Sequence, residues 1–351
     1  MLFSQEDLQY TQDFLLRLLN IPSPTGMTKT AIDFVEAEAK KLGIQSTRTH
    51  KGALCFTIQG KQSESSRLLT AHVDTLGGMI KEILPSGQMR IQKIGGYAWS
   101  TIEGETCRIF SEKKTFTGTV LLENTSVHVN SKVNETERTA DNMVIVLDEV
   151  VHSAEDVKKL GISVGDFIAW DPRAVLTESG YIKSRHLDDK ASVAILFGVV
   201  HALQRNNREL AVDCTFLISN NEEIGYGGNS NIPQQTVEYV AVDMGAIGKG
   251  QTTDEHCVSI CAMDGSGPYH FGLRQHLVHI AQQHQLHYAV DIYPHYSSDA
   301  SAAVRSGADI KHGLVGPGVA HSHTYERLHS DALIHTSELL IHYLQSPLCE
   351  V

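Results

Sequence analysis

The sequence lacks closely paired cysteines. Its 351 residues include 6 cysteines, and no two of them form a Cys-x-x-Cys pair. Cys257 and Cys261 alternate with Val258 and Ile260 as in a strand, so we interpret them as core or edge thiols rather than as zinc ligands. Sparse, scattered thiols are typical of a reducing compartment.

An excess of basic residues, a long apolar run and internal repeats are also absent. The chain carries 29 Lys and Arg against 41 Asp and Glu, a net charge of −12. This balance argues against nucleic acid or an anionic membrane surface as the main partner. No stretch approaches the roughly 20 apolar residues of a membrane span, and residues 1–7 show no basic segment leading into an apolar one. We therefore predict a cytoplasmic protein.

The pattern of the chain changes twice, which predicts two domains. Residues 1–75 and 173–351 alternate apolar strand-like runs with helical periodicity, as an α/β domain does. Residues 76–172 consist mostly of short alternating strands separated by glycine and polar turns. We expect this middle segment to be a small all-β domain inserted into the α/β domain.

Several elements can be placed from the pattern. Ser4 is expected to cap a helix over residues 4–19, with Asp7 in its first turn. A long apolar helix is predicted over residues 191–204, with Asp188 placed to cap it. Further helices are expected at 27–42, 271–284 and 331–345, and strands at 53–59, 67–73, 212–218, 237–242 and 288–293.

Two adjacent glutamates follow the most central of these strands. The apolar run 212–218 leads into Asn220-Asn221-Glu222-Glu223 and then into a glycine-rich turn. Ligands of open α/β sheets bind at the carboxyl ends of the strands. One carboxylate there can bind a metal while the other remains free as a base. The alternative interpretation is a solvated pair of glutamates on a surface turn.

Other candidate ligands occupy the same kind of place, where a strand ends or a loop begins a helix. Each has a plainer explanation: a structural histidine, a helix cap or a solvated turn residue. Together their imidazoles and carboxylates suit a pair of divalent cations such as zinc, cobalt or manganese. The set is His72 with Asp74, Asp188, Glu222 with Glu223, Asp243, and either His321 or His323.

The chemistry of such a pair accounts for the residue types. Two cations a few ångströms apart need a bridging carboxylate and further nitrogen or oxygen ligands on each side. A carboxylate that is not a ligand takes a proton from the attacking water and delivers it to the leaving amine. Glu222 and Glu223 supply one ligand and one such base. Asp74 lies two residues beyond His72 and can hold its second ring nitrogen.

These motifs resemble the co-catalytic metallo-aminopeptidases that include bacterial glutamyl aminopeptidases and the archaeal tetrahedral aminopeptidases. The resemblance covers nearly the whole chain. It implies a mixed sheet sandwiched by helices, an inserted barrel-like β domain, and a homo-oligomer, often a dodecamer, in which the inserted domain contributes to oligomerisation and substrate access. The matching pieces are Ala71-His72-Val73-Asp74, Leu187-Asp188-Asp189-Lys190, Asn221-Glu222-Glu223-Ile224-Gly225, Val242-Asp243-Met244-Gly245 and a histidine near the carboxyl end.

The resemblance also implies roles for individual residues. It describes an exopeptidase that hydrolyses the amino-terminal bond of short peptides with two divalent metal ions per subunit, zinc or alternatively cobalt or manganese. Glu222 acts as general base and acid, and Asp74 orients the first histidine ligand. The implied metal ligands are His72 and Asp243 for one ion, Glu223 and His323 for the other, and Asp188 as the bridge.

Two departures from the family pattern leave alternatives open. Lys190 stands where the family usually has arginine, and His321 competes with His323 as the terminal ligand. The ending His-Ser-His-Thr-Tyr-Glu-Arg is similar to a bacterial branch linked to the osmolyte N-acetylglutaminylglutamine amide, which has a blocked amino end. An amidohydrolase or deacylase acting on such a blocked peptide is therefore the alternative function. A non-enzymatic scaffold built on the inserted domain is a third hypothesis.

Overall fold

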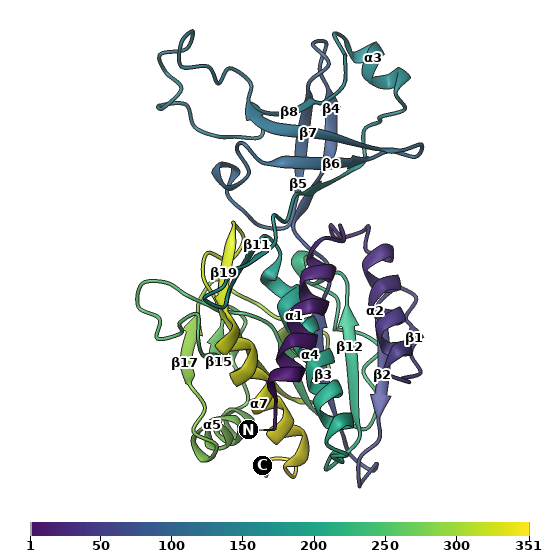
Figure 1. The fold of residues 1–351 in the computed structure, drawn as a ribbon, viewed down its shortest axis with the longest axis vertical. Helices are drawn as coiled ribbons and strands as arrows, with labels where there is room; N and C mark the ends of the chain where they lie inside the picture. Colours follow the sequence, from purple (N-terminus) through teal and green to yellow (C-terminus); the bar gives the residue numbers. More distant parts are fainter. Residues whose placement is uncertain (1, 351) are drawn as a thin grey trace.

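The computed structural model describes residues 2–350 and consists of two bodies stacked along the long axis (Figure 1). The lower body in the figure is a mixed sheet with helices on its faces, and the upper body is a closed β-barrel. Both chain ends lie in the lower body, away from the barrel. Among residues 2–350, no helix is long and apolar enough to cross a membrane.

The large sheet has ten strands, and its central four run parallel. β3 pairs in parallel with β12 and β13, and β13 pairs in parallel with β18, while β2 and β15 join antiparallel. The parallel strands end at one edge, where Ser219 of β12 lies beside His72 of β3. The order is β1 (Thr47–Arg48), β2 (Leu54–Ile58), β12 (Cys214–Ser219), β3 (Ser66–His72), β13 (Thr236–Val242), β18 (Lys311–Val319), β15 (Val258–Asp264) and β16 (Gly267–Pro268); β14 (Gly245–Ala246) pairs with β18, and β17 (Tyr288–Tyr293) with β15.

Side chains alternate between the two faces of this sheet, as the pleat requires. On β3, Leu69 packs into a large cluster with the helices on one face, and Leu68 packs into a second cluster that includes helix α6 on the other. The first face is covered by α1 (Gln5–Leu19), α2 (Lys29–Lys41), α4 (Leu187–Arg205), α5 (Phe271–Gln283) and α7 (Ser330–Gln345), and the second by α6 (Asp299–Arg305).

The upper body is a six-stranded barrel with its own apolar core. Ile91, Ile109 and Ile168 point into it and are fully buried. Closure leaves no sheet edge unpaired. The strands follow the order β4 (Gly77–Ile83), β5 (Met89–Ile94), β8 (Met143–Leu147), β7 (Thr115–Leu122), β6 (Thr106–Phe110) and β9 (Phe167–Trp170), with helix α3 (Ala154–Lys159) and a 3-10 turn, η1 (Trp99–Thr101), in the connections.

Most predicted elements are confirmed, and one capping prediction is wrong. Ser4 caps α1 and shares a capping box with Asp7, as expected. Asp188 does not cap α4: His186 holds the cap position, and Asp188 has extended backbone angles inside the first turn. Its carboxylate points instead to two histidines. Two features were not predicted: β18 and the small sheet formed by β10 (Val175–Leu176), β11 (Tyr181–Ser184) and β19 (Glu326–His329).

Candidate metal centre

The predicted ligands meet at the carboxyl edge of the parallel strands. His72 is the last residue of β3, and Asp243 follows β13 directly. Asp188 enters from the start of α4, and the short 3-10 turn η2 (Glu222–Ile224) carries both glutamates. His72, Asp188 and Asp243 offer ligand atoms that all lie within 4.8 Å of one another.

Asp188 lies between two histidines and presents one oxygen to each. Its Oδ1 is 3.4 Å from His72 Nε2, and its Oδ2 is 3.3 Å from His323 Nε2. Ser322 donates a hydrogen bond to Oδ2 at 3.1 Å. Glu326 accepts the Asp188 backbone N–H at 3.1 Å, which fixes the turn that carries the carboxylate. This is the arrangement expected of a bridging ligand.

The lone pair of His72 faces acceptors only. Its Nδ1 lies 3.0 Å from the carbonyl oxygen of Asp74, so we infer that Nδ1 carries the proton. Nε2 is buried and has no hydrogen-bond partner, although carboxylate oxygens of Asp188, Glu222 and Asp243 lie 3.4, 3.6 and 3.9 Å away. Such a convergence of acceptors is stabilised by a cation, so the donor set fits a metal ion.

Asp74 organises the site in two ways. Its backbone carbonyl holds the His72 ring, and its carboxylate oxygen Oδ1 is farther from Nδ1, at 3.4 Å. The carboxylate accepts the backbone N–H groups of Glu222 and Glu223 at 3.2 and 3.3 Å, and a hydrogen bond from Thr25 at 2.7 Å. Asp74 thereby positions the turn that carries both glutamates.

The two glutamates diverge. Glu222 Oε2 lies 3.6 Å from His72 Nε2, whereas Glu223 Oε2 lies 3.6 Å from His323 Nε2. His323, with a left-handed φ of 64°, turns its ring inward, and its Nδ1 contacts the carbonyl of Gly96 next to the barrel. His321 is exposed, and its carbonyl accepts hydrogen bonds from Thr324. The geometry therefore places His323, rather than His321, beside the carboxylates.

The electrostatics reflect an excess of buried negative charge. Burial and the Asp188 carboxylate raise the pKa of Asp243 to about 7, and burial together with Asp188 raises that of Glu223 to about 8. Burial would also raise the pKa of Asp188, but hydrogen bonds from His323 and His72 hold it well below its usual value. The carboxylates in turn raise the pKa of His323 to about 11 against the effect of burial. Positive ions at this point would relieve the repulsion.

Two residues that take part in the site were not predicted from the sequence. Glu326 is buried and also accepts the backbone N–H of His323 at 2.9 Å, so it ties that residue to Asp188. The hydroxyl of Tyr296 is buried without a partner, and this residue lines the cavity beside Glu222 and Asp243. No sequence pattern predicts that a single tyrosine in a loop lines an active-site cavity. Glu326 was considered only for its spacing from His321 and His323, as a guide to which of them is the ligand.

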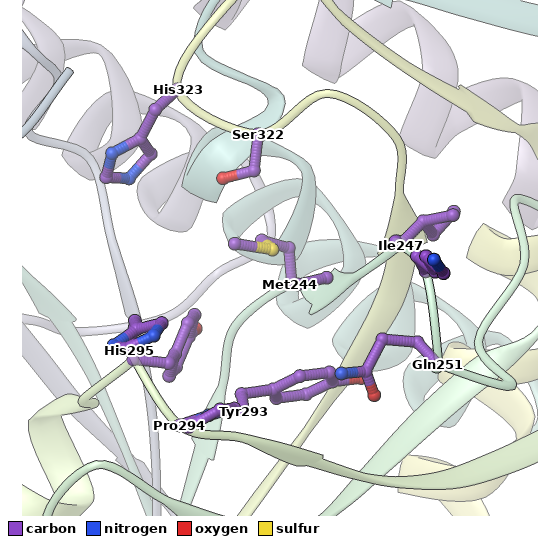
Figure 2. A pocket seen from close by; sticks show the side chains of 12 residues that line it. Met244, Ile247, Gln251, Tyr293, Pro294, His295, Ser322 and His323 are labelled. Carbon is purple, nitrogen blue, oxygen red and sulfur yellow. The ribbon is translucent and has the colours of Figure 1, made fainter. Parts of the chain in front are cut away.

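A second, more apolar cavity of ≈ 360 Å³ continues from the candidate metal centre. Figure 2 shows Ser322 and His323 on one side of it and Tyr293, Pro294 and His295 on the other, with Met244 between them. His295, Tyr296 and His323 line both cavities. The remaining lining residues are Ala246, Ile247, Gly248, Lys249 and Gln251, so no carboxylate lines it.

Comparisons with known proteins agree with this fold. Residues 52–339 match the family model described as M42 glutamyl aminopeptidase. A Bacillus subtilis (strain 168) protein named "Putative aminopeptidase YhfE" is 54% identical over 339 residues, which cover 96% of this chain and 98% of that protein.

Solved structures give the same picture of the backbone. A TET aminopeptidase from Thaumarchaeota archaeon SCGC AB-539-E09 superimposes with a TM-score of 0.87 at 15% identity, over 95% of this chain and 96% of the other. The Pyrococcus horikoshii TET1 peptidase, which can assemble into a tetrahedron or a large octahedral shell, gives a TM-score of 0.85 at 21% identity over 96% and 100% of the two chains.

Proposed function

This chain belongs to the M42 glutamyl aminopeptidase family, and from that premise we propose that it cleaves the amino-terminal bond of short peptides with two divalent cations and Glu222 as general base. The observation that carries the proposal is the position of Asp188, whose two oxygens face His72 and His323 separately at 3.4 and 3.3 Å. One buried carboxylate between two imidazoles is suited to bridging two ions.

The donor atoms divide into two overlapping sets. His72, Asp188 and Asp243 would hold one ion, and Asp188, Glu223 and His323 the other. Ions bound there supply an acidified water and polarise the scissile carbonyl. Imidazole and carboxylate ligands suit zinc, with cobalt and manganese as alternatives.

Glu222 is proposed to move the proton. In this assignment Glu222 is not a metal ligand, whereas Glu223 binds one of the two ions. The side chain of Glu222 is 14% exposed and lines the cavity, and its backbone is held by the carboxylate of Asp74. It accepts a proton from water and delivers it to the nitrogen of the departing amine. Asp74 is a positioning residue, which sets His72 and the Glu222 turn relative to each other.

The apolar cavity is proposed to receive the side chain of the first substrate residue. It opens from the candidate metal centre through His295, Tyr296 and His323 (Figure 2). Its lining is mostly apolar and contains Lys249 but no carboxylate. We therefore expect apolar and acidic amino-terminal residues to be cleaved in preference to lysyl and arginyl ones. In Lys249→Glu this order should reverse toward basic residues; an unchanged order would reject this cavity as the specificity pocket.

The proposal includes a homo-oligomer assembled with help from the barrel; the related PhTET1-12s is a dodecamer. The division into a catalytic domain of residues 1–75 and 173–351 and an inserted domain of residues 76–172 stays a prediction, as does the cytoplasmic location. The molar mass measured by light scattering after size-exclusion chromatography tests the assembly. A mass equal to that of one chain would contradict it.

Two measurements test the function. Elemental analysis should find about two more metal ions per chain in wild type than in Asp188→Ala, which should also lose turnover. Retention of both ions in Asp188→Ala would remove the bridging role.

A panel of free-amine peptides and their acetylated counterparts distinguishes the alternative function. Preference for acetylated substrates would favour a deacylase or amidohydrolase, including one acting on N-acetylglutaminylglutamine amide. The scaffold hypothesis predicts no tightly bound transition metal.

A further inference from the structure

A second cluster of metal-ligand side chains lies at the start of α7, outside the candidate metal centre. It consists of His256, His329 and Asp331, whose ligand atoms all lie within 4.8 Å of one another. His256 comes from the loop before β15, His329 ends β19, and Asp331 lies in the first turn of α7. None of the three lines the cavities beside the candidate metal centre.

The hydrogen bonds of His329 leave an unusual contact. Its Nε2 lies 2.9 Å from the carbonyl oxygen of Ser179, which can only accept, so Nε2 carries the proton. Its Nδ1 then bears the single lone pair of the ring, which accepts the backbone N–H of Asp331 at 3.1 Å, a helix-capping hydrogen bond that an ion bound at Nδ1 would replace. The same Nδ1 lies 3.1 Å from Asp331 Oδ2. Two acceptors facing each other at this distance need a cation between them, either a proton or a metal ion.

His256 completes the set from the other side. Its Nδ1 is 2.9 Å from the same Asp331 oxygen, and its ring centre is 4.3 Å from that of His329. Its Nε2 faces the hydroxyl of Tyr181 at 3.4 Å. Both imidazoles thus turn Nδ1 toward the carboxylate and hold Nε2 against an outer oxygen, as histidine ligands of metal ions commonly do.

We propose that His256, His329 and Asp331 form an additional divalent-metal site, of the kind that takes zinc. The observed N–O separations of 2.9 and 3.1 Å are close to the roughly 3.3 Å between ligands in a tetrahedral site with bonds of about 2.0 Å. Asp331 and His256 are partly exposed, at 47% and 37%, so water can fill the fourth position.

The site would join three segments that the backbone brings together. A bound ion would tie the loop before β15 and the start of α7 to β19, whose first residue, Glu326, holds Asp188 and His323. The ion would therefore be structural, since its three ligands leave the substrate cavities untouched. It would stabilise the strand that anchors the candidate metal centre.

The test is zinc stoichiometry after equilibrium dialysis of the full-length protein in zinc-buffered solution, with His256→Ala as the variant. His284→Ala is the matched control, because His284 stacks on His342 at the surface and contacts none of the three ligands. We expect wild type and His284→Ala to bind one more zinc per chain than His256→Ala, and zinc to raise the melting temperature of wild type more than that of His256→Ala. His256→Gln, which keeps a polar group there, should show the same loss and guards against a folding defect.

The measurement separates this site from the catalytic one. Asp188→Ala should keep one zinc per chain, and Asp188→Ala combined with His256→Ala should keep none. If Asp188→Ala keeps more zinc, the proposed function fails, but the loss on changing His256 still supports the additional site. Equal zinc content in wild type and His256→Ala would overturn the proposal. So would imidazole nitrogen NMR signals showing His329 doubly protonated at neutral pH in zinc-saturated protein, because the cation would then be a proton.

Discussion

At the scale of single residues, the two adjacent glutamates show how local geometry separates two chemical roles. Glu222 and Glu223 share the η2 turn, but one faces His72 and the other His323. Their backbone N–H groups both bind the Asp74 carboxylate. Adjacent residues on a regular strand would point to opposite faces of the sheet. The 3-10 turn at the strand end lets both face the same cavity.

A buried aspartate near the start of the chain gives a pH-dependent prediction. Burial would raise the pKa of Asp7, but hydrogen bonds from Arg205, Ser4 and His201 outweigh it and lower the pKa from 3.8 to about 2. The contribution to stability is therefore present above about pH 4 and is lost as the pH falls toward 2. It corresponds to about 2 kcal/mol, reduced somewhat because Arg205 is 31% exposed.

Asp7→Asn should accordingly lower stability by about 1–2 kcal/mol at pH 7. The difference between wild type and variant should shrink below pH 4, since the wild-type carboxylate then becomes protonated. Melting temperatures recorded from pH 6 to pH 3 would check this. A constant difference over that range would show that Asp7 does not act through its charge.

At the scale of elements, β18 shows why part of the fold was not predictable. Its sequence, Lys-His-Gly-Leu-Val-Gly-Pro-Gly-Val, contains glycine and proline residues that argue against a central strand. The structure explains them: a Cβ on Gly316 would lie 1.8 Å from the carbonyl oxygen of Asp243, and one on Gly318 would lie 1.9 Å from that of Asp254. The neighbouring backbone approaches too closely for any side chain.

Gly316→Ala should therefore displace Asp243 from the candidate metal centre. We expect a loss of about 2 kcal/mol or more of stability and weaker metal binding. Gly313→Ala in the same strand is the matched control, because its added Cβ would meet only the side chain of Leu273 at 3.2 Å and atoms farther away. Metal titration of both variants makes the comparison. Equal affinities would mean that Asp243 is not positioned by this contact.

The elements around the site were largely predictable because their patterns are local. The capping box of Ser4 with Asp7 and the apolar strands before His72 and Asp243 can be recognised in a short window. Contacts between distant segments could not be predicted this way. No sequence pattern places the Gly96 carbonyl against His323.

Lys190 illustrates a contact of this second kind. Its buried Nζ donates to the carbonyls of Leu18 and Ile21 at 3.2 and 2.7 Å, which joins α4 to the end of α1. Lys190 stands where the family usually has arginine, and its partners here are backbone oxygens. Lys190→Met keeps the length of the side chain and leaves both carbonyls without this donor. It should cost about 1–3 kcal/mol in denaturant unfolding; an unchanged midpoint would contradict the proposed link.

At the scale of the whole molecule, the barrel and the lower body meet beside the candidate metal centre. Arg185 is buried and donates a hydrogen bond to the carbonyl of Thr101 in the barrel. Its Nη2 also lies 3.1 Å from Glu105 Oε1. Arg185 also donates to the carbonyl of Thr324 at 3.3 Å, next to His323. The barrel therefore supports the loop that carries His323, in addition to any role in assembly.

Arg185→Met should reduce kcat/KM by about 10-fold or more while metal content stays near that of wild type, because Arg185 is not itself a ligand. Lys114→Met is the matched control: Lys114 pairs with Glu149 at 3.2 Å within the barrel and is 56% exposed, so its loss should have little effect. Steady-state kinetics and elemental analysis of both variants give the result. Equal kinetics in the two would refute a supporting role of the barrel.

The central claim is that Glu222 transfers the proton while Glu223 binds metal. Glu222→Gln has nearly the same shape but cannot accept a proton, so metal content and turnover measured on the same preparation test it most directly. The account predicts that wild-type metal content is retained and that hydrolysis of an aminoacyl-nitroanilide falls by about 10²–10⁴-fold. More than a tenth of wild-type turnover, with metals in place, would contradict it.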